Sequence, residues 1–310
     1  MKILVTGASG FVGHWLVREL DAAGHKAVGT PPSSDLDITD SVAVSDLMRA
    51  TRPDAVVHLA GLSYGPDARR EPERAFAVNE GGTRSVIAAA AAASRATPVL
   101  VVSSADVYGS PAADDLPLTE SAPLLADQPY GLSKLAQERV AFESAATGGP
   151  SVIVVRPFNH TGPGQRTEFV VPALARRIVA ARQSGSRTIV AGNLDVRRDF
   201  SDVRDVARAY RLILEAVAAS VMPPAPRVYN IASGRAVVIR DIAHAFAEMA
   251  GIDLEITVDP HLVRESDPPE IRGDASLIEA DLGWRPSIPF DVTLKDVFED
   301  AVSRSGSAPR

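Results

Sequence analysis

The chain has 310 residues, of which 45% are hydrophobic and 23% charged, and its formal net charge is −7. This composition is that of a globular protein with one large domain or two closely joined domains. The acidic balance argues against a nucleic-acid partner, the absence of cysteine excludes disulfides and thiolate zinc sites, and no apolar run is long enough to span a membrane.

The N-terminus leads directly into a strand-like segment without a leader, so we expect a cytoplasmic protein. The first half of the chain then alternates short apolar runs, which predict buried strands, with segments of helical periodicity. This alternation predicts an α/β fold: a Rossmann-type doubly wound parallel sheet with helices on both faces. Strands are expected at 2–6, 26–30, 55–60, 98–102 and 151–155, and helices at 11–23, 41–50, 72–93 and 130–146.

The pattern changes after Pro157, where prolines cluster, loops lengthen and the predicted elements become shorter. We expect residues 1–157 to form the main sheet domain, with a returning segment near 199–232 that adds a strand at 228–231. Residues 158–310 should form mainly a smaller mixed α/β C-terminal substrate-binding domain that caps the sheet. The last residues, 303–310, are expected to be a frayed tail.

A glycine-rich turn follows the first predicted strand and opens the first predicted helix. Its early glycines would let the backbone approach a pyrophosphate, and its last glycine would let the helix pack on the strand. A glycine-rich loop without a ligand is the alternative, but the strand before and the helix after favour a dinucleotide site. The expected contacts are Gly7, Ser9, Gly10, Phe11, Val12 and Gly13.

Tyr130 and Lys134 are four residues apart on one predicted helix, so they share a face. Tyr-x-x-x-Lys alone is a weak signal, but here it follows the glycine turn and the hydroxyl pair that ends the strand at 98–102. The ordered set indicates redox chemistry on a nucleotide cofactor. A free phenol has a pKa of about 10, and a neighbouring ammonium and an oxidised nicotinamide would lower it. A packed aromatic and a solvated lysine are the simpler alternatives.

The Gly-x-x-Gly-x-x-Gly spacing together with Tyr130 and Lys134 resembles the extended short-chain dehydrogenase/reductase family over nearly the whole chain. The resemblance implies that Tyr130 is the acid/base at the substrate oxygen, that Lys134 contacts the nicotinamide ribose, and that Ser104 bonds the reacting oxygen. It implies NADP(H) or NAD(H) as cofactor. The further cofactor contacts that it implies are Asp37, Ile38, Leu59, Ala60, Asn79 and Pro157, beside Tyr130 and Lys134.

Several of these positions have a second interpretation. Asp37 would meet the adenine, while Asp40 or Thr39 would cap the helix at 41–50. His58 is interpreted as a packing residue at a strand end, and Asn79 could simply pin its helix. The segment after the strand at 26–30 has no arginine for a 2′-phosphate and no aspartate directly at the strand end for a ribose diol, so the choice between NAD and NADP stays open.

Three further segments, 156–165, 192–200 and 264–267, resemble the GDP-sugar branch of the family, which includes GDP-mannose 4,6-dehydratases and GDP-4-keto-6-deoxy-D-mannose reductases. The Asn-His-x-Gly-Pro-Gly-Gln form is similar to the reductases. Arg198 and Arg264 would hold the diphosphate, since a guanidinium is a planar fork of donors, and Asp267 the guanosine ribose. The implied substrate contacts are Ser63, Ser104, Asp106, Asn159, Phe169, Val170, Arg176, Asn193, Leu194, Arg198, Arg264 and Asp267.

The resemblance implies NAD(P)H-dependent reduction of the C4 ketone of GDP-4-keto-6-deoxy-D-mannose to GDP-D-rhamnose. Dehydratases of the branch carry a base, usually Glu, at the position of Asp106 and Thr at the position of Ser104. Asp is one methylene shorter, so Asp106 is either a weaker base or a polar wall residue. A GDP-mannose 4,6-dehydratase or another nucleotide-sugar epimerase is therefore the alternative, and a non-catalytic nucleotide-binding protein a remote one.

The helices at 72–93 and 130–146 resemble the pair that forms a four-helix dimer interface in this family, which implies a homodimer. The alanine run of the first helix could equally pack inside the monomer. We expect a GDP-sugar as substrate and no nucleic acid, membrane or metal as partner.

Overall fold

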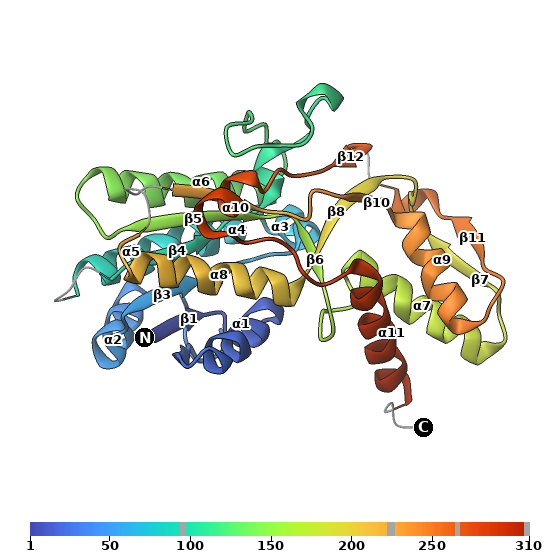
Figure 1. The fold of residues 1–310 in the computed structure, drawn as a ribbon, viewed down its shortest axis with the longest axis horizontal. Helices are drawn as coiled ribbons and strands as arrows, with labels where there is room; N and C mark the ends of the chain where they lie inside the picture. Colours follow the sequence, from blue (N-terminus) through green and yellow to red (C-terminus); the bar gives the residue numbers. More distant parts are fainter. Residues whose placement is uncertain (94–96, 222–226, 264–266, 307–310) are drawn as a thin grey trace.

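The computed structural model describes residues 1–93, 97–221, 227–263 and 267–306. Its centre is a six-stranded parallel sheet in the order β2-β1-β3-β4-β5-β9 (Figure 1). The inner strands are almost fully buried, as expected for a parallel sheet with helices on both faces. The strands are β1 (Lys2–Thr6), β2 (Lys26–Gly29), β3 (Ala55–His58), β4 (Val99–Val102), β5 (Val152–Pro157) and β9 (Arg227–Ile231).

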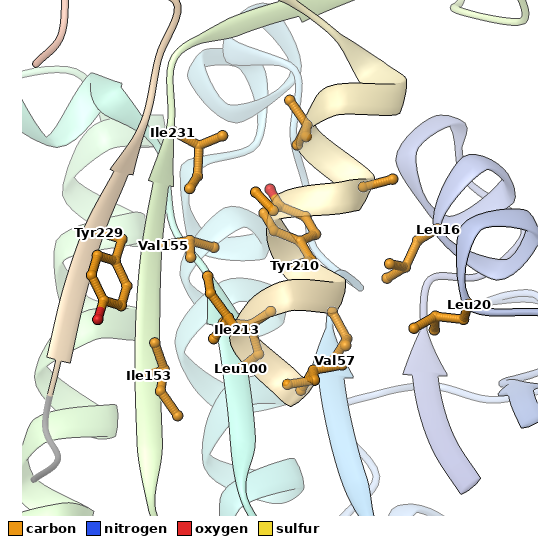
Figure 2. Close-up of a cluster of buried hydrophobic side chains, with 14 of the residues drawn as sticks. Leu16, Leu20, Val57, Leu100, Ile153, Val155, Tyr210, Ile213, Tyr229 and Ile231 are labelled. Atoms are coloured by element: carbon orange, nitrogen blue, oxygen red, sulfur yellow. The ribbon is translucent and has the colours of Figure 1, made fainter. Parts of the chain in front are cut away.

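Helices cover both faces of this sheet, so the fold is doubly wound α/β. On one face, Leu16 and Leu20 of α1 and Tyr210 and Ile213 of α8 pack against the strands (Figure 2). On the other face lie α2, α5 and α6, whose apolar side chains form a second cluster with the sheet. The helices are α1 (Phe11–Ala22), α2 (Ser41–Thr51), α5 (Gly82–Ala91), α6 (Pro129–Ala146), α8 (Val203–Ala218) and the short α10 (Ser276–Leu282).

A smaller unit with its own core lies beyond the carboxyl ends of the strands (Figure 1). Its strand β8 pairs with β10, β12 and β6, and a separate pair is formed by β7 and β11. Three helices pack around ring stacks such as Phe246 on Phe298. The elements are β6 (Asn159–Thr161), β7 (Thr188–Ala191), β8 (Arg197–Asp202), β10 (Ala236–Val238), β11 (Glu255–Val258), β12 (Glu270–Ile271), α7 (Val170–Ser184), α9 (Ile239–Ala250) and α11 (Phe290–Gly306).

Short helices complete the loops: α3 (Gly65–Arg70), η2 (Ala105–Tyr108), η3 (Ala113–Asp115) and η4 (Pro260–Leu262). The strands and helices predicted up to residue 157 agree with the structure within two residues at each end, with one exception. The helix predicted over 72–93 is divided into α4 (Pro72–Phe76), a widened π-helical turn η1 (Ala77–Gly81) and α5.

The expected frayed tail is wrong for residues 303–306, because α11 continues to Gly306 and Arg304 pairs with Asp300 one turn earlier. Residues 307–310 lie outside the described part of the chain. Among the described helices, none combines the length and apolarity that crossing a membrane requires.

Candidate active site

The glycine turn forms a tight cradle at the carboxyl end of β1. The amide of Gly10 donates to the carbonyl of Gly7 at 2.9 Å, and a Cβ on Gly13 would lie only 2.2 Å from that same carbonyl oxygen. Helix α1 can press against the turn only because residue 13 has no side chain. No side chain caps the start of α1, so its first N–H groups are left for an anion. The cradle therefore fits a dinucleotide pyrophosphate.

A groove of about 200 Å³ opens beside this cradle. Phe11 lies in it and faces the ring of His160 from β6, with centroids 6.3 Å apart, while Trp15 donates its indole N–H to the carbonyl of Pro163 at 3.0 Å. The groove therefore lies between α1 and the loop after β6. Val12 points toward the sheet core instead. The groove is lined by Ser9, Gly10, Phe11, His14, Trp15, Pro163 and Gly164.

The loop after β3, which carries Leu59 and Ala60, is held by hydrogen bonds to β1 and to the π turn. Ala60 donates its amide to the Thr6 hydroxyl at 3.1 Å. Asn79, fully buried in the π turn, binds the amide and carbonyl of Leu62 at 2.8 and 3.2 Å and the Ser133 hydroxyl at 2.8 Å. Asn79 thus pins this loop to α6.

Tyr130 lies in the first turn of α6, and the residue after it explains how the helix approaches the site. A Cβ on Gly131 would lie 2.6 Å from the carbonyl oxygen of Asp106, so only glycine allows α6 to lie against η2. This contact brings the Tyr130 phenol into hydrogen-bond reach of the Ser104 side chain. The Lys134 ammonium lies 6.0 Å from the centre of the Tyr130 ring. The three predicted catalytic residues are therefore together.

The Lys134 ammonium is held by the protein on two sides. Nζ donates to the carbonyl of Val102 at 2.9 Å and to Oε1 of Gln137 at 2.8 Å, which leaves a third N–H for a ligand. Lys134 is only 5% exposed, and burial lowers its pKa to about 8, against the opposing effect of Glu138. The lysine is therefore mostly charged at neutral pH and loses its proton in mildly alkaline solution.

The phenol of Tyr130 behaves differently from the sequence-based expectation. In the protein alone its pKa is raised, first by burial and then by the Asp106 carboxylate, while the hydrogen bond with Ser104 acts in the opposite direction. The expected lowering is thus not a property of the protein side chains by themselves. At neutral pH the phenol holds its proton and can act as an acid toward a substrate oxygen.

The residues expected around adenine lie on the segment between β2 and α2. Asp40 caps α2 by accepting the amides of Val42 and Ala43 at 2.9 and 3.1 Å. Asp37 accepts the backbone and hydroxyl of Thr39 at 2.9 and 2.8 Å, which lowers its pKa. Asp40 is therefore the cap, and Asp37 stays ionised beside the loop. Ile38 is buried in the core on the α2 side, and Pro157 is buried at the end of β5.

The residues expected at the nucleotide sugar are spread over the cap and the loops facing it. Phe169 precedes α7 and contacts Tyr64 edge to face at 5.4 Å, so α7 approaches the loop that follows β3. Asn193 accepts the amide of Asp195 at 2.9 Å, and Leu194 is buried in the cap core. Exposed side chains among the set are Ser63, Asp106, Asn159, Val170, Arg176 and Asn193.

Two predicted ligands of the nucleotide are paired with each other. The guanidinium of Arg198 forms an ion pair with Asp267 and donates to the carbonyl of Pro268 at 2.8 Å. Their side chains are 13% and 14% exposed. Arg264, the second predicted diphosphate ligand, lies outside the described residues. The sequence placed both Arg198 and Asp267 at the substrate but did not predict that they bind each other.

The sequence analysis also missed an aromatic and cationic cluster at this rim. The Arg166 guanidinium lies over the rings of Tyr64 and Phe169, at 5.9 and 5.7 Å from their centres. Its only signal was the position of Arg166 directly after the Gly-Pro-Gly-Gln run. Within the described residues, no three His, Asp or Glu side chains gather in a way that could hold a metal ion.

A glycine cradle at the first strand and a serine, tyrosine and lysine at the sheet edge define an α/β protein built for nicotinamide dinucleotide chemistry. Residues 3–232 match the model of the NAD dependent epimerase/dehydratase family. The chain is 36% identical over 304 residues to a GDP-6-deoxy-D-mannose reductase of Pseudomonas aeruginosa, covering 98% of both chains. It therefore belongs to the NAD dependent epimerase/dehydratase family.

A second relative and a solved structure show the same similarity to enzymes that act on GDP-6-deoxyhexoses or bind NADPH. The chain is 32% identical over 286 residues to a GDP-6-deoxy-D-talose 4-dehydrogenase of Aggregatibacter actinomycetemcomitans, covering 91% of this chain and 92% of the relative. The structure of RMD from Pseudomonas aeruginosa complexed with NADPH superimposes with a TM-score of 0.88 at 36% identity, covering 98% of this chain and 99% of that one.

Proposed function

We propose that the protein is an NAD(P)H-dependent oxidoreductase that reduces the C4 ketone of GDP-4-keto-6-deoxy-D-mannose to GDP-D-rhamnose. The observation that carries the proposal is the Ser104–Tyr130–Lys134 arrangement beside the glycine cradle. The similarity to the GDP-6-deoxy-D-mannose reductase over 98% of the chain supports the choice of substrate.

The chemistry divides between the cofactor and the side chains. A nicotinamide dinucleotide, when bound, supplies the hydride. The Ser104 hydroxyl hydrogen-bonds the ketone oxygen, and Tyr130 gives its proton to that oxygen as negative charge develops. The third N–H of Lys134 binds the nicotinamide ribose. The lysine's charge then stabilises the phenolate that remains.

The two units of the fold would take different halves of this reaction. Residues 1–157, with the returning segment near 199–232, bind the dinucleotide, and residues 158–310 mainly bind the nucleotide sugar. On the sugar side, Arg198 turns from Asp267 to the diphosphate, because a phosphate offers the same bidentate geometry with more charge. Asn159 contacts the sugar-phosphate, and Phe169, Val170 and Arg176 line the nucleotide site.

We also propose a cytoplasmic homodimer formed by the helices α5 and α6. Much of α5 is buried within the monomer, including Val86, Ile87 and Ala90, while α6 presents Leu132 at 38% exposure. The interface would therefore depend more on α6 and on the outer side of α5. A monomeric mass at micromolar concentration in light scattering would contradict the proposal.

The test is the absorbance of reduced nicotinamide with NADH and with NADPH, after addition of GDP-4-keto-6-deoxy-D-mannose. Stoichiometric loss of absorbance with a GDP-deoxyhexose product supports the reductase and identifies the preferred cofactor. The second candidate is a GDP-mannose 4,6-dehydratase, which the Asp106 carboxylate near the phenol favours. Turnover of GDP-mannose without added cofactor, and no reductase activity, would establish that alternative instead.

A further inference from the structure

A buried carboxylate lies one helical turn beyond Lys134. Glu138, on the same face of α6, is 2% exposed and accepts the Ser103 hydroxyl at 2.5 Å. It also accepts two bonds from Arg156, at 3.0 Å from Nε and 2.7 Å from Nη2. We propose that Glu138 is a positioning residue that fixes α6 against the two neighbouring strands and so sets the geometry of the catalytic residues. This inference rests on the proposed reductase function.

The partners of Glu138 come from the elements on which the site is built. Ser103 directly precedes Ser104 at the end of β4, and Arg156 belongs to β5, which pairs with β4. One carboxylate therefore bonds groups at the ends of two adjacent strands. Since Glu138 and Lys134 are on the same helix, a shift of the carboxylate would move the lysine relative to Ser104.

Arg156 extends this network to the loop that faces the substrate. It is 3% exposed, and its Nη1 donates to the hydroxyl of Tyr108 and to the carbonyl of Glu120, both at 3.1 Å. Tyr108 ends η2, the turn that carries Asp106, and donates to the side chain of Asn230 at 2.7 Å. The network thus joins α6, β4, β5, β9 and η2. A buried, fully bonded network of this kind gives rigidity that separate surface contacts do not.

The charge of Glu138 also acts on Lys134. Tyr130 of the same helix lies beside the ammonium, and His58 of β3 is close enough to feel its charge. Asp106 of η2 acts on the Tyr130 phenol, and Arg156 of β5 pairs with Glu138. Burial depresses the pKa of His58, so it is neutral, and Glu138 raises the pKa of Arg156, so it stays charged. Removal of the carboxylate charge would leave the Arg156 cation uncompensated, and both changes favour neutral Lys134.

The test measures Lys134 directly, without substrate. The chain has four lysines, Lys2, Lys26, Lys134 and Lys295, so a protein labelled with [ε-13C]lysine gives few signals and Lys134→Met assigns the one of interest. In Glu138→Gln we expect the pKa of Lys134 to fall by about one unit. A matched control is Glu143→Gln on the exposed side of the same helix. Identical Lys134 titrations in Glu138→Gln and wild type would overturn the inference.

Turnover adds a second measurement. Activity should be present while Lys134 is protonated and be lost as the pH rises through its pKa, which is about 8 in the wild type. In Glu138→Gln the alkaline limb of kcat/KM, which reports the free enzyme, should move down with the lysine. In this variant, which removes the Glu138 charge, a lower kcat with an unshifted profile would mean that Glu138 affects turnover without acting on Lys134, and would contradict the inference.

A milder variant covers the case in which Glu138→Gln does not fold. Ser103→Ala removes one hydrogen bond to Glu138 but keeps the buried charges of Glu138 and Arg156. We therefore expect kcat to fall several-fold with an unchanged Lys134 titration. Wild-type kcat in Ser103→Ala would refute the positioning role. If the wild-type protein reduces no nucleotide sugar, the proposed function fails, while the Lys134 titration in Glu138→Gln still decides whether Glu138 acts on the lysine.

Discussion

His58 gives a quantitative prediction for stability against pH. Its ring is fully buried, with Nδ1 2.8 Å from the Thr6 hydroxyl and Nε2 3.0 Å from the Thr83 hydroxyl. Because Thr83 donates its own proton to the carbonyl of Asn79 at 2.6 Å, Nε2 must be the donor toward Thr83. Burial, and then the charge of Lys134, lower the pKa of His58 to about 3.

The sign follows from the unfolded chain, where a histidine has a pKa of about 6.5. Below that pH the unfolded state binds a proton that the native His58 does not, so stability is lost as the pH falls toward about 3. Between pH 7 and pH 5, with a native pKa of about 3, this one residue should remove about 2 kcal/mol from the free energy of unfolding.

The assay is urea unfolding at pH 7 and pH 5 of the wild type, His58→Gln and the control His244→Gln, whose histidine is exposed on α9. Glu120 and Asp199 have raised pKa values and act in the opposite direction, so the difference between variants is the informative quantity. The stability advantage of wild type over His58→Gln should shrink by about 2 kcal/mol on acidification. A parallel pH dependence of wild type and His58→Gln would refute the reasoning.

Three further predictions concern the site. Tyr130→Phe should lower kcat by about 10²–10⁴-fold and leave NADH binding, measured by fluorescence, nearly unchanged; wild-type turnover would contradict the proton-donor role. Gly13→Ala places a Cβ 2.2 Å from the Gly7 oxygen, so it should cost about 1–3 kcal/mol of stability and weaken NADH binding. The control Gly81→Ala, where a Cβ would have open space, should change neither. Arg198→Met should weaken GDP binding in calorimetry by about 10-fold or more without affecting NADH; an equal loss in the control Arg197→Met, which removes an exposed neighbour paired with Glu270, would show a general charge effect.

The sequence predicted best what depends on neighbouring residues. The apolar runs of β1 and β4 and the glycine turn at Gly7 are continuous along the chain, and their pattern determines local structure without reference to the rest of the fold. Side-chain pairing is different, because it depends on where distant segments meet. Arg198 and Asp267 are 69 residues apart, and nothing in either segment predicted that they bind each other.

The division of the helix predicted over 72–93 also depends on contacts between segments that are distant in the sequence. An alanine-rich run with helical periodicity predicts an unbroken helix, since a π turn has no propensity signal of its own. The widened turn is supported by contacts of Asn79 with Leu62 and Ser133, which come from a loop and from α6. Only the assembled site shows why the helix departs from its regular form there.

The protonation state of Tyr130 bears on the choice between the two candidate reactions. A reductase needs a phenol that holds its proton until the ketone oxygen becomes an alkoxide, whereas a dehydratase begins by oxidising its substrate and needs a phenolate that accepts a proton. Burial and the Asp106 carboxylate both raise the pKa of Tyr130. The same carboxylate that suggests a dehydratase by its position therefore favours the reductase by its charge. Asp106→Asn removes that charge but keeps the side chain's shape, so it should lower the pKa of Tyr130. Any oxidation of GDP-mannose should then extend to lower pH. Ketone reduction near neutral pH should stay largely intact.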